Sequence, residues 1–291
     1  MQTKQGKTAL DWGNTLFLVS AHAMAVVAAV YMMAGGFSWW TLALAIAWFF
    51  LCGFSITAGY HRLFAHRSYE ARPLVRALYL FFGAAAIQNS ALNWCGDHRR
   101  HHARTDTPQD PYNIRRGFWW AHIGWVLNEC ADRSNGGLPD LRRDPLVRFQ
   151  NDHYLLLAVL SGGLLPLGLG YLWGDPIGAV LVVGFLRLVF QWHVTFAINS
   201  IAHMFGSQPY GDRTTARDSG WVALFTLGEG YHNFHHRFPA DYRNGARWFH
   251  VDPTKWLIWT LSRLRMTMDL RRTEPARIDR ARELSSMARS A

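Results

Sequence analysis

The sequence has 291 residues, half of them apolar, with a net charge of +10 and a pI of about 9.9. The mean hydropathy of -0.04 does not exclude a membrane protein, because the charged residues gather in some segments and leave others almost uncharged. The three cysteines, Cys52, Cys95 and Cys130, have no CxxC spacing, which argues against a disulfide framework and indicates a reducing compartment.

Four apolar stretches of about 20 residues, long enough to cross a membrane, follow one another along the chain. Residues 15–34 and 39–59 are joined by a short link, and residues 154–173 and 177–200 are joined by Gly-Asp-Pro. Links this short connect neighbouring antiparallel helices. The sequence therefore predicts four transmembrane helices arranged as two hairpins.

The charged residues lie mainly outside these stretches. Thirteen arginines fall between Arg62 and Arg148, and the chain after residue 201 is also basic, whereas the hairpin links contain only one charged residue, Asp175. The positive-inside rule then places the N-terminus and a cap of residues 61–153 and 201–291 in the cytoplasm. Contact with anionic lipid explains the basic pI without nucleic acid. We expect residues 1–291 to form a single domain.

Two segments of this cytoplasmic part are themselves rich in apolar residues. If residues 74–92 crossed the membrane, histidine-rich segments on either side of them would lie on opposite faces, so we expect a buried or re-entrant helix there. Residues 254–270 are amphipathic, which favours packing against the cap or the membrane interface.

Eight of the fourteen histidines form three clusters, HRLFAH, HRRHH and HNFHH. In HxxHH, histidines at i, i+3 and i+4 share one face of a helix. His61 and His66, at i and i+5, need a helix end or a turn in order to converge. The clustered residues are His61, His66, His98, His101, His102, His232, His235 and His236.

Each cluster lies at the cytoplasmic end of a predicted apolar helix, so the folded chain can bring the three together. Imidazole binds iron, zinc, copper and nickel, and a single zinc ion needs only three or four ligands. Eight converging imidazoles therefore indicate two metal ions rather than solvated charge. His203 follows the last apolar stretch by one turn and is either a further ligand or a packed residue. The remaining histidines are expected to be packed or hydrogen-bonded: His22, His122, His153, His193 and His250.

The clusters resemble the three histidine boxes of membrane fatty acid desaturases of the stearoyl-CoA (Δ9) type. The resemblance runs from His61 to Arg243 through GYHRLFAHRSYEA, QNSALNWCGDHRRHH, NSIAHMFGSQPY and LGEGYHNFHHRFPADYR. It implies an all-α integral membrane fold, with four transmembrane helices in two hairpins and a cytosolic helical cap that holds a di-iron site.

The resemblance also implies which residues form that site. Asn199 would hold a water molecule on one iron, and Asn89 matches a contact to the substrate head group. Asp97 and Glu229 would accept hydrogen bonds from ligand imidazoles, unless they are surface acids beside basic residues. The metal ligands would be His61, His66, His98, His101, His102, His203, His232, His235 and His236.

The implied reaction uses O2 and two electrons to introduce a cis double bond, at the Δ9 position, into a saturated acyl chain. A bent apolar tunnel lined by the helices around residues 39–54 and 181–196 would hold that chain. The sequence has no CxxCH and no ferredoxin cysteine set, so the electrons would come from a ferredoxin or a small haem protein with its reductase. The arginine-rich cap suits either such an acidic donor or lipid head groups.

The chain departs from the animal acyl-CoA enzymes at Gly96, Asn128 and Glu129, where that family has basic residues that contact CoA. This favours an acyl chain on a membrane lipid or a carrier protein, with acyl-CoA as the alternative. Two other functions remain compatible with the sequence. One is a hydroxylase of acyl chains, alkanes or carotenoids from the same superfamily, and the other is a metal-handling membrane protein. The expected location is a bacterial inner membrane with the active site facing the cytoplasm.

Overall fold

The computed structural model describes residues 9–129 and 138–290, so Cys130 and both chain ends lie outside the described residues. The described part is mostly helical, and its one two-stranded sheet pairs β1 (Glu70–Ala71) with β2 (Thr267–Met268) in an antiparallel register. This confirms the predicted all-α class.

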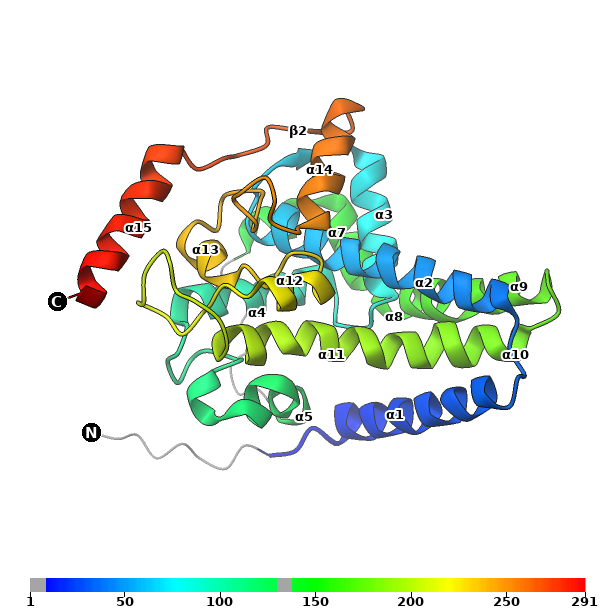
Figure 1. Cartoon of the computed structure of the whole chain (residues 1–291). Coiled ribbons are helices and arrows are strands. Elements are labelled where there is room, and N and C mark those ends of the chain that lie inside the picture. Colours follow the sequence, from blue (N-terminus) through cyan, green and yellow to red (C-terminus); the bar gives the residue numbers. More distant parts are fainter. Residues whose placement is uncertain (1–8, 130–137, 291) are drawn as a thin grey trace.

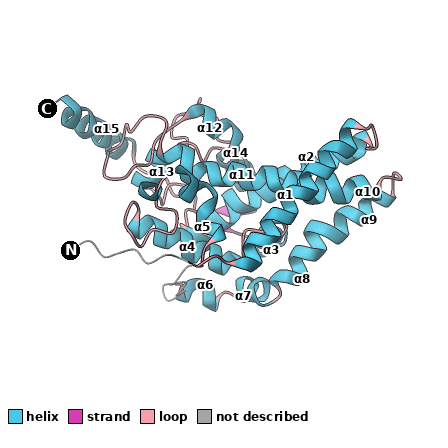
Figure 2. Ribbon diagram, turned by 90° about the horizontal axis from the view of Figure 1, so that it is seen from below, coloured by secondary structure: helices cyan, strands magenta, loops and turns pink. Residues whose placement is uncertain are grey.

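Four helices are long and apolar enough to cross a membrane, as the sequence predicts. They run lengthwise through the molecule, with both hairpin links at one end and the histidine-bearing segments at the other (Figures 1 and 2). The second span continues six residues beyond its predicted end, because a π-helix carries it through the first histidine cluster. The spans are α1 (Trp12–Met33); α2 (Trp39–Phe54) with η1 (Ser55–Ala65); α8 (Tyr154–Val159) with η4 (Leu160–Leu164) and α9 (Leu165–Tyr171); and α10 (Pro176–Gly178) with η5 (Ala179–Leu186), α11 (Arg187–Ser200) and η6 (Ile201–His203).

The remaining helices form the other end of the molecule. The apolar segment 74–92 is helical only as far as α3 (Pro73–Ala84), whose 12 residues give about 18 Å, too short to span a membrane. The amphipathic segment 254–270 is helical only in α14 (Pro253–Arg263), because Thr267 and Met268 pair with β1 instead. The other helices are α4 (Ala91–Arg104), η2 (Ile114–Arg116), η3 (Trp120–Gly124), α5 (Trp125–Leu127), α6 (Pro139–Arg143), α7 (Pro145–Asp152), α12 (Gly220–Phe225), α13 (His232–Arg237) and α15 (Pro275–Ser290).

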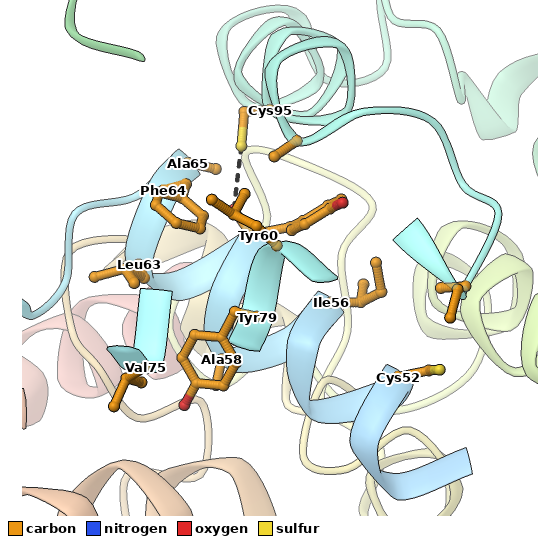
Figure 3. Close-up of a cluster of buried hydrophobic side chains, with 14 of the residues drawn as sticks. Cys52, Ile56, Ala58, Tyr60, Leu63, Phe64, Ala65, Val75, Tyr79 and Cys95 are labelled. Atoms are coloured by element: carbon orange, nitrogen blue, oxygen red, sulfur yellow. Dashed lines mark hydrogen bonds between the residues drawn. The ribbon is translucent and has the colours of Figure 1, made fainter. Parts of the chain in front are cut away.

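The main hydrophobic core surrounds η1, whose residues are all buried (Figure 3). Helix α3 can pack against it because Gly83 has no side chain, since a Cβ there would lie 2.4 Å from the Tyr60 ring. On the other side, Cys95 of α4 donates its thiol hydrogen to the Tyr60 carbonyl oxygen over 3.2 Å. The core therefore holds the first and second histidine clusters against each other.

The two hairpins are joined at their far end by the carboxylate of Asp175. It accepts hydrogen bonds from Tyr31 Oη at 2.7 Å, from the Ser38 backbone N–H at 2.9 Å and from the Thr41 hydroxyl at 2.5 Å. It also caps α10 by accepting the Gly178 N–H at 2.8 Å. One buried acid thus ties the α1–α2 turn to the start of the last span.

Replacing Asp175 with asparagine is expected to destabilise the protein by about 1–3 kcal/mol, because an amide oxygen accepts less strongly and its NH2 group faces donors. The measurement is the thermal unfolding midpoint of the detergent-purified protein. Asp212→Asn, at an exposed position, is the matched control and should leave the midpoint unchanged. Equal unfolding midpoints for the two variants would contradict the stabilising role of Asp175.

Candidate metal centre

The π-helix η1 brings together the two histidines of the first cluster. The His66 N–H donates to the His61 carbonyl oxygen at 3.1 Å, a bond between residues five apart. Residues at i and i+5 therefore lie one above the other, and the two imidazole centroids are 4.9 Å apart. An ordinary α-helix would not place residues i and i+5 on one face, and the wider turn of the π-helix does.

The nine predicted ligands gather into two groups in which the ligand atoms lie within 4.8 Å of one another. Helix α4 supplies both groups, since His98 and His102 face one and His101 faces the other. Helix α13 divides its histidines in the same way. The first group is His61, His66, His98, His102 and His235, and the second is His101, His203, His232 and His236.

Within each group, the Nε2 atoms have the separations expected of ligands to a common ion. Those of His66 and His98 are 2.7 Å apart, and those of His232 and His203 are 3.1 Å apart. Two nitrogens bound to one ion at about 2.0–2.1 Å and at a right angle would be about 2.9 Å apart. The spacing therefore fits one metal ion in each group.

Acceptors on the outer side of the rings fix the tautomers of several of these histidines. His101 Nδ1 lies 2.8 Å from an Asp110 carboxylate oxygen, and His61 Nδ1 lies 2.8 Å from Glu229 Oε2. His203 Nδ1 is 2.7 Å from the hydroxyl of Thr215, which itself donates to Asp106.

The Asp110 carboxylate only accepts hydrogen bonds, and the Thr215 hydroxyl already donates to Asp106, so the protons of His101 and His203 sit on Nδ1 and their Nε2 lone pairs point inward. Converging lone pairs repel one another unless a cation lies between them, so the donor set fits bound metal.

Burial favours the neutral form of several imidazoles in the two groups. The pKa values of His98, His102 and His235 are held well below the usual range, first by burial and then by the neighbouring imidazoles. The same causes lower the pKa of His232 and His236. A neutral imidazole has a free lone pair, which is the form that binds a metal ion.

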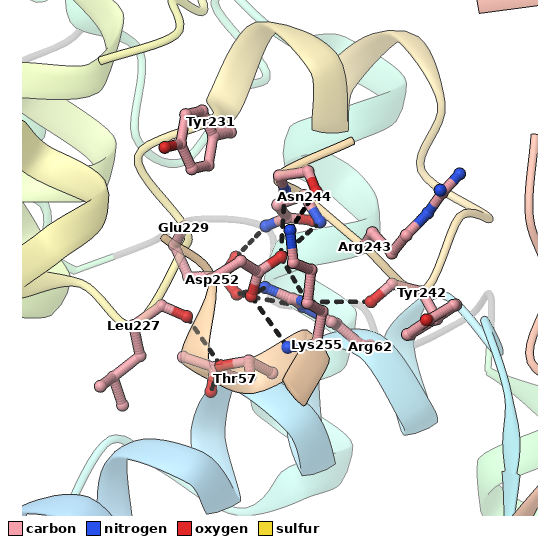
Figure 4. Close-up of polar contacts among 12 residues, drawn as sticks. Thr57, Arg62, Leu227, Glu229, Tyr231, Tyr242, Arg243, Asn244, Asp252 and Lys255 are labelled. Atoms are coloured by element: carbon pink, nitrogen blue, oxygen red, sulfur yellow. Dashed lines mark hydrogen bonds and ion pairs between the residues drawn. The ribbon is translucent and has the colours of Figure 1, made fainter. Parts of the chain in front are cut away.

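A buried ion network supports the centre from behind (Figure 4). The Arg62 guanidinium donates to Glu229 Oε1 at 2.8 Å and to both carboxylate oxygens of Asp252 at 3.0 and 3.1 Å. The second oxygen of Glu229 accepts from Asn244 at 2.7 Å. Burial alone would raise the pKa of Glu229, but His61 and Arg62 together lower it to about 2. Glu229 is thus a fixed anion that orients a ligand imidazole.

Replacing Asp110 with asparagine is expected to weaken metal binding and activity by about 10- to 100-fold, because the amide holds the His101 ring less firmly in the required tautomer. Both side chains are buried, so water cannot replace the lost contact. Metal content after dialysis against a chelator measures the effect. Asp152→Asn, at an exposed position, is the control, and equal metal retention in both variants would contradict this role.

A cavity of about 390 Å³ opens beside both groups of histidines. His61 and His98 of the first group line it, as do His101 and His232 of the second. Most of the remaining wall is apolar.

Of the expected tunnel walls, residues 181–196 contribute Trp192, Thr195 and Phe196. The helix that begins with residues 39–54 lines the cavity through Ile56 and Thr57 of its continuation η1, whereas residues 39–54 themselves do not. Helix α1, which was not expected on the wall, contributes Phe17 and Leu18.

The other predicted site residues also line the cavity. Asn199 and Asn89 are on its wall, and the Asn89 side-chain oxygen accepts the Ser90 N–H at 2.9 Å. Asp97 is on the wall as well, 3.9 Å from Arg100. The roles assigned to these three side chains stay predictions.

Asp110, Asp106 and Thr215 were missed as imidazole partners by the sequence analysis. The only signal for the two acids was their position in the segment that directly follows HRRHH.

The remaining histidines are packed or hydrogen-bonded, as predicted. His153 Nδ1 is 2.9 Å from the Phe149 carbonyl oxygen, and the His250 ring stacks on Tyr231 with centroids 4.3 Å apart. His22, His122 and His193 contact one another and are considered below.

Comparison with known proteins places this arrangement in a family. The model of the family described as fatty acid desaturase matches residues 37–269. The chain is 47% identical over 225 residues to a probable acyl-CoA desaturase of Schizosaccharomyces pombe, covering 76% of this chain and 47% of that protein. It is 44% identical over 232 residues to acyl-CoA desaturase 1 of Saccharomyces cerevisiae, covering 79% and 46% respectively.

The chain thus spans about half the length of these two fungal relatives. It is also 35% identical over 258 residues to the sn-1 stearoyl-lipid 9-desaturase of Anabaena variabilis, covering 86% of this chain and 90% of that protein. A family match over most of the sequence, together with nine histidines gathered at one end of four membrane-length helices, leads to one conclusion. The chain belongs to the fatty acid desaturase family.

Proposed function

We propose that the protein is an O2-dependent fatty acyl desaturase that introduces a cis double bond, at the Δ9 position, into a saturated acyl chain. The observation that carries this proposal is the cavity, whose wall joins histidines of both groups to a largely apolar surface. Such a cavity can hold a long apolar substrate directly beside two metal ions.

The two histidine groups would each hold one iron ion, and Asn199 would hold a water molecule on one of them. Bound iron would supply the oxygen chemistry that an unactivated C–H bond requires, since no side chain in the cavity can break such a bond. Asp110, Glu229 and Thr215 would hold the ligand imidazoles in place. Asp97 is proposed to add a further contact near the second cluster.

The rest of the cavity would position the acyl chain. Gln88 Nε2 donates to Thr195 Oγ1 at 2.9 Å, which links the turn after α3 to α11 beside the metal groups. Apolar side chains such as Ile87, Trp192 and Phe196 would exclude water around the reacting carbons. Position then decides which carbon atoms react, because chemistry is fast only for atoms held close to the metal.

The carrier of the acyl chain is proposed from the polar part of the cavity. Among the described residues that line it there is no lysine or arginine, and the polar ones include Asn14, Asn89 and Asp97. A CoA group carries several phosphates that need cationic partners. This favours a lipid-linked or carrier-protein-linked chain, whereas the names of the fungal relatives support acyl-CoA.

We further propose that the site faces the cytoplasm of a bacterial cell, with the protein in the inner membrane. The two electrons would come from a separate ferredoxin or small haem protein with its reductase. The arginines of the cap would attract either that acidic donor or lipid head groups.

The test incubates membranes that contain the protein with labelled stearoyl chains on CoA, on a glycerolipid and on acyl carrier protein, together with O2 and a reduced nicotinamide. A cis-monounsaturated product from any carrier supports desaturation, and the carrier with the highest rate identifies the substrate. Only hydroxylated products would assign the protein to the hydroxylases. No oxidised product from any carrier, with metal bound, would favour the metal-handling alternative.

A further inference from the structure

Three histidines outside the metal centre form a hydrogen-bonded chain, named here the histidine chain. His22 Nε2 of α1 lies 3.0 Å from His193 Nε2 of α11, and His193 Nδ1 lies 3.0 Å from His122 Nε2 of η3. At its ends, His22 Nδ1 lies 2.7 Å from the Leu18 carbonyl oxygen and His122 Nδ1 lies 2.9 Å from the Ser200 hydroxyl. The chain therefore joins three elements that are far apart in the sequence.

The Leu18 contact fixes the direction of both bonds between the rings in the neutral state. The Leu18 carbonyl oxygen only accepts, so His22 has its proton on Nδ1 and accepts at Nε2 from His193. His193 then accepts at Nδ1 from His122 Nε2, and His122 Nδ1 lies 2.9 Å from the Ser200 hydroxyl, which donates to the Phe196 carbonyl oxygen. The bonds between the rings need only one proton on each ring, so the histidine chain carries no net charge, and a charge would be costly in apolar surroundings.

The geometry differs from that of the two metal groups. There, one nitrogen of each ring converges on a common point, whereas His193 uses both of its nitrogens for partners on opposite sides. A linear chain of this kind connects structural elements and does not enclose an ion. Polar side chains within a membrane span are rare because they are costly, which indicates a specific role.

The histidine chain lies directly behind one wall of the acyl cavity. All three segments that it joins line this cavity: α1 with Phe17 and Leu18, α11 with Trp192 and Phe196, and the η3–α5 segment with Trp125. The wall packs against the histidine chain, since the His22 and Trp192 ring centroids are 6.4 Å apart and those of His122 and Phe196 are 5.8 Å apart.

Helix α1 depends on this chain for its position along the cavity. Within the described part of the protein, its other side-chain hydrogen bonds to distant segments lie near its two ends. Asn14 donates to the Val126 carbonyl oxygen at 3.3 Å, and Tyr31 donates to Asp175 at 2.7 Å. His22 is the directional contact in the middle, and the apolar contacts around it are non-directional.

We propose that the histidine chain fixes the spacing of α1, α11 and the η3–α5 segment around the acyl cavity, with His193 as its central positioning residue. It would thereby set which acyl chain lengths and which carbon positions react. This inference rests on the proposed function, since it concerns the same cavity. Without the histidine chain, α1 can shift, and the wall formed by Phe17 and Leu18 no longer has a fixed distance from Trp192.

The test compares the monounsaturated products of cells that express His193→Leu, His22→Leu and the double variant. Each variant is expected to change the ratio of sixteen-carbon to eighteen-carbon products, or the ratio of double-bond positions, by about three- to tenfold. This change is somewhat smaller than the discrimination that an enzyme obtains from one methylene group of its substrate. The double variant should match the single variants, because either substitution already breaks the chain. His193→Gln keeps a donor and an acceptor and should restore much of the wild-type ratio.

His153→Leu is the matched control, because His153 is exposed and its ring bonds to the Phe149 carbonyl oxygen within its own segment. A product ratio reports selectivity independently of the amount of folded enzyme. If the leucine variants lower the total product but keep the wild-type ratio, the chain only stabilises the fold and the proposal is wrong.

A second measurement does not depend on catalysis. Hydrogen–deuterium exchange of the purified protein should be faster in residues 12–33 of both leucine variants than in the wild type or in His153→Leu. Unchanged exchange in this helix would contradict the positioning role. A wild-type protein that makes no unsaturated product would instead contradict the proposed function, so the two failures can be told apart.

Discussion

Alanine at His98 and alanine at His101 are each expected to reduce desaturation by more than about a hundredfold, since even residues that only orient metal ligands cost 10–100-fold when lost. The two positions are one turn apart on α4 and both buried, yet they face different histidine groups. Each variant should therefore weaken a different metal ion. Metal analysis of the purified proteins should show about two irons per chain in the wild type and less in either variant.

The double substitution His98→Ala with His101→Ala makes this prediction sharper. If the groups hold separate ions, the double variant should lose nearly all of its iron, and each single variant only part of it. His153→Ala should keep the wild-type iron content and activity. A single variant that loses no metal and keeps its activity would show that its histidine is not a ligand.

Arg62→Met is expected to have the largest effect on stability. The Arg62 guanidinium is buried and pairs with both Glu229 and Asp252, so its loss removes the cation that the two buried carboxylates share. Breaking a buried ion pair in this way costs about 3–5 kcal/mol. We expect a sharp fall in folded protein in the membrane and a lower thermal unfolding midpoint in what remains.

The matched control is Arg67→Met, five residues further along the chain. Arg67 is 56% exposed and pairs with Asp140, so its loss should cost no more than about 1 kcal/mol. Similar losses of stability in the two variants would show that the buried ion network contributes no more than an exposed ion pair. A stable Arg62→Met protein would contradict the account of the support behind the metal centre.

The spans and the clustered histidines could be predicted because each depends on a local pattern. An apolar run of twenty residues is read directly from the sequence, and HxxHH fixes three rings on one helical face. The conformation of η1 could not be read in this way. The spacing of His61 and His66 showed only that an ordinary helical face would not suffice, and the packing of η1 against α3 and α4 accompanies the π-helix that joins them.

Contacts across long stretches of chain were beyond the sequence for a physical reason. The Thr215 hydroxyl contacts His203 and donates its hydrogen to Asp106, which lies more than a hundred residues earlier in the chain. The histidine chain likewise joins residues 22, 122 and 193, each of which is a lone histidine in its own segment. No local periodicity marks such residues, because their meaning depends on which helices pack together.

The wall of the cavity shows the same limit. Apolar composition alone made residues 39–54 an equally good candidate for lining an acyl tunnel, but the wall is reached only further along this helix, by Ile56 and Thr57 of η1. Trp48 and Cys52 pack into the core instead. Of the turn at residues 87–89, only Asn89 was expected on the wall, whereas all three residues line the cavity. The turn lies there with Ile87 and Asn89 at φ angles of 47° and 85°, values that few side chains adopt and that its surroundings must hold in place.

The most direct test of the central claim is the fatty acid composition of a host that expresses the wild-type protein, compared with the same host expressing His101→Ala. The account predicts new cis-monounsaturated chains with the wild type and a composition like that of the empty host with the variant. An unchanged composition with folded, iron-loaded wild-type protein would contradict the proposed reaction. Equal amounts of new product from both proteins would contradict the assignment of the metal centre.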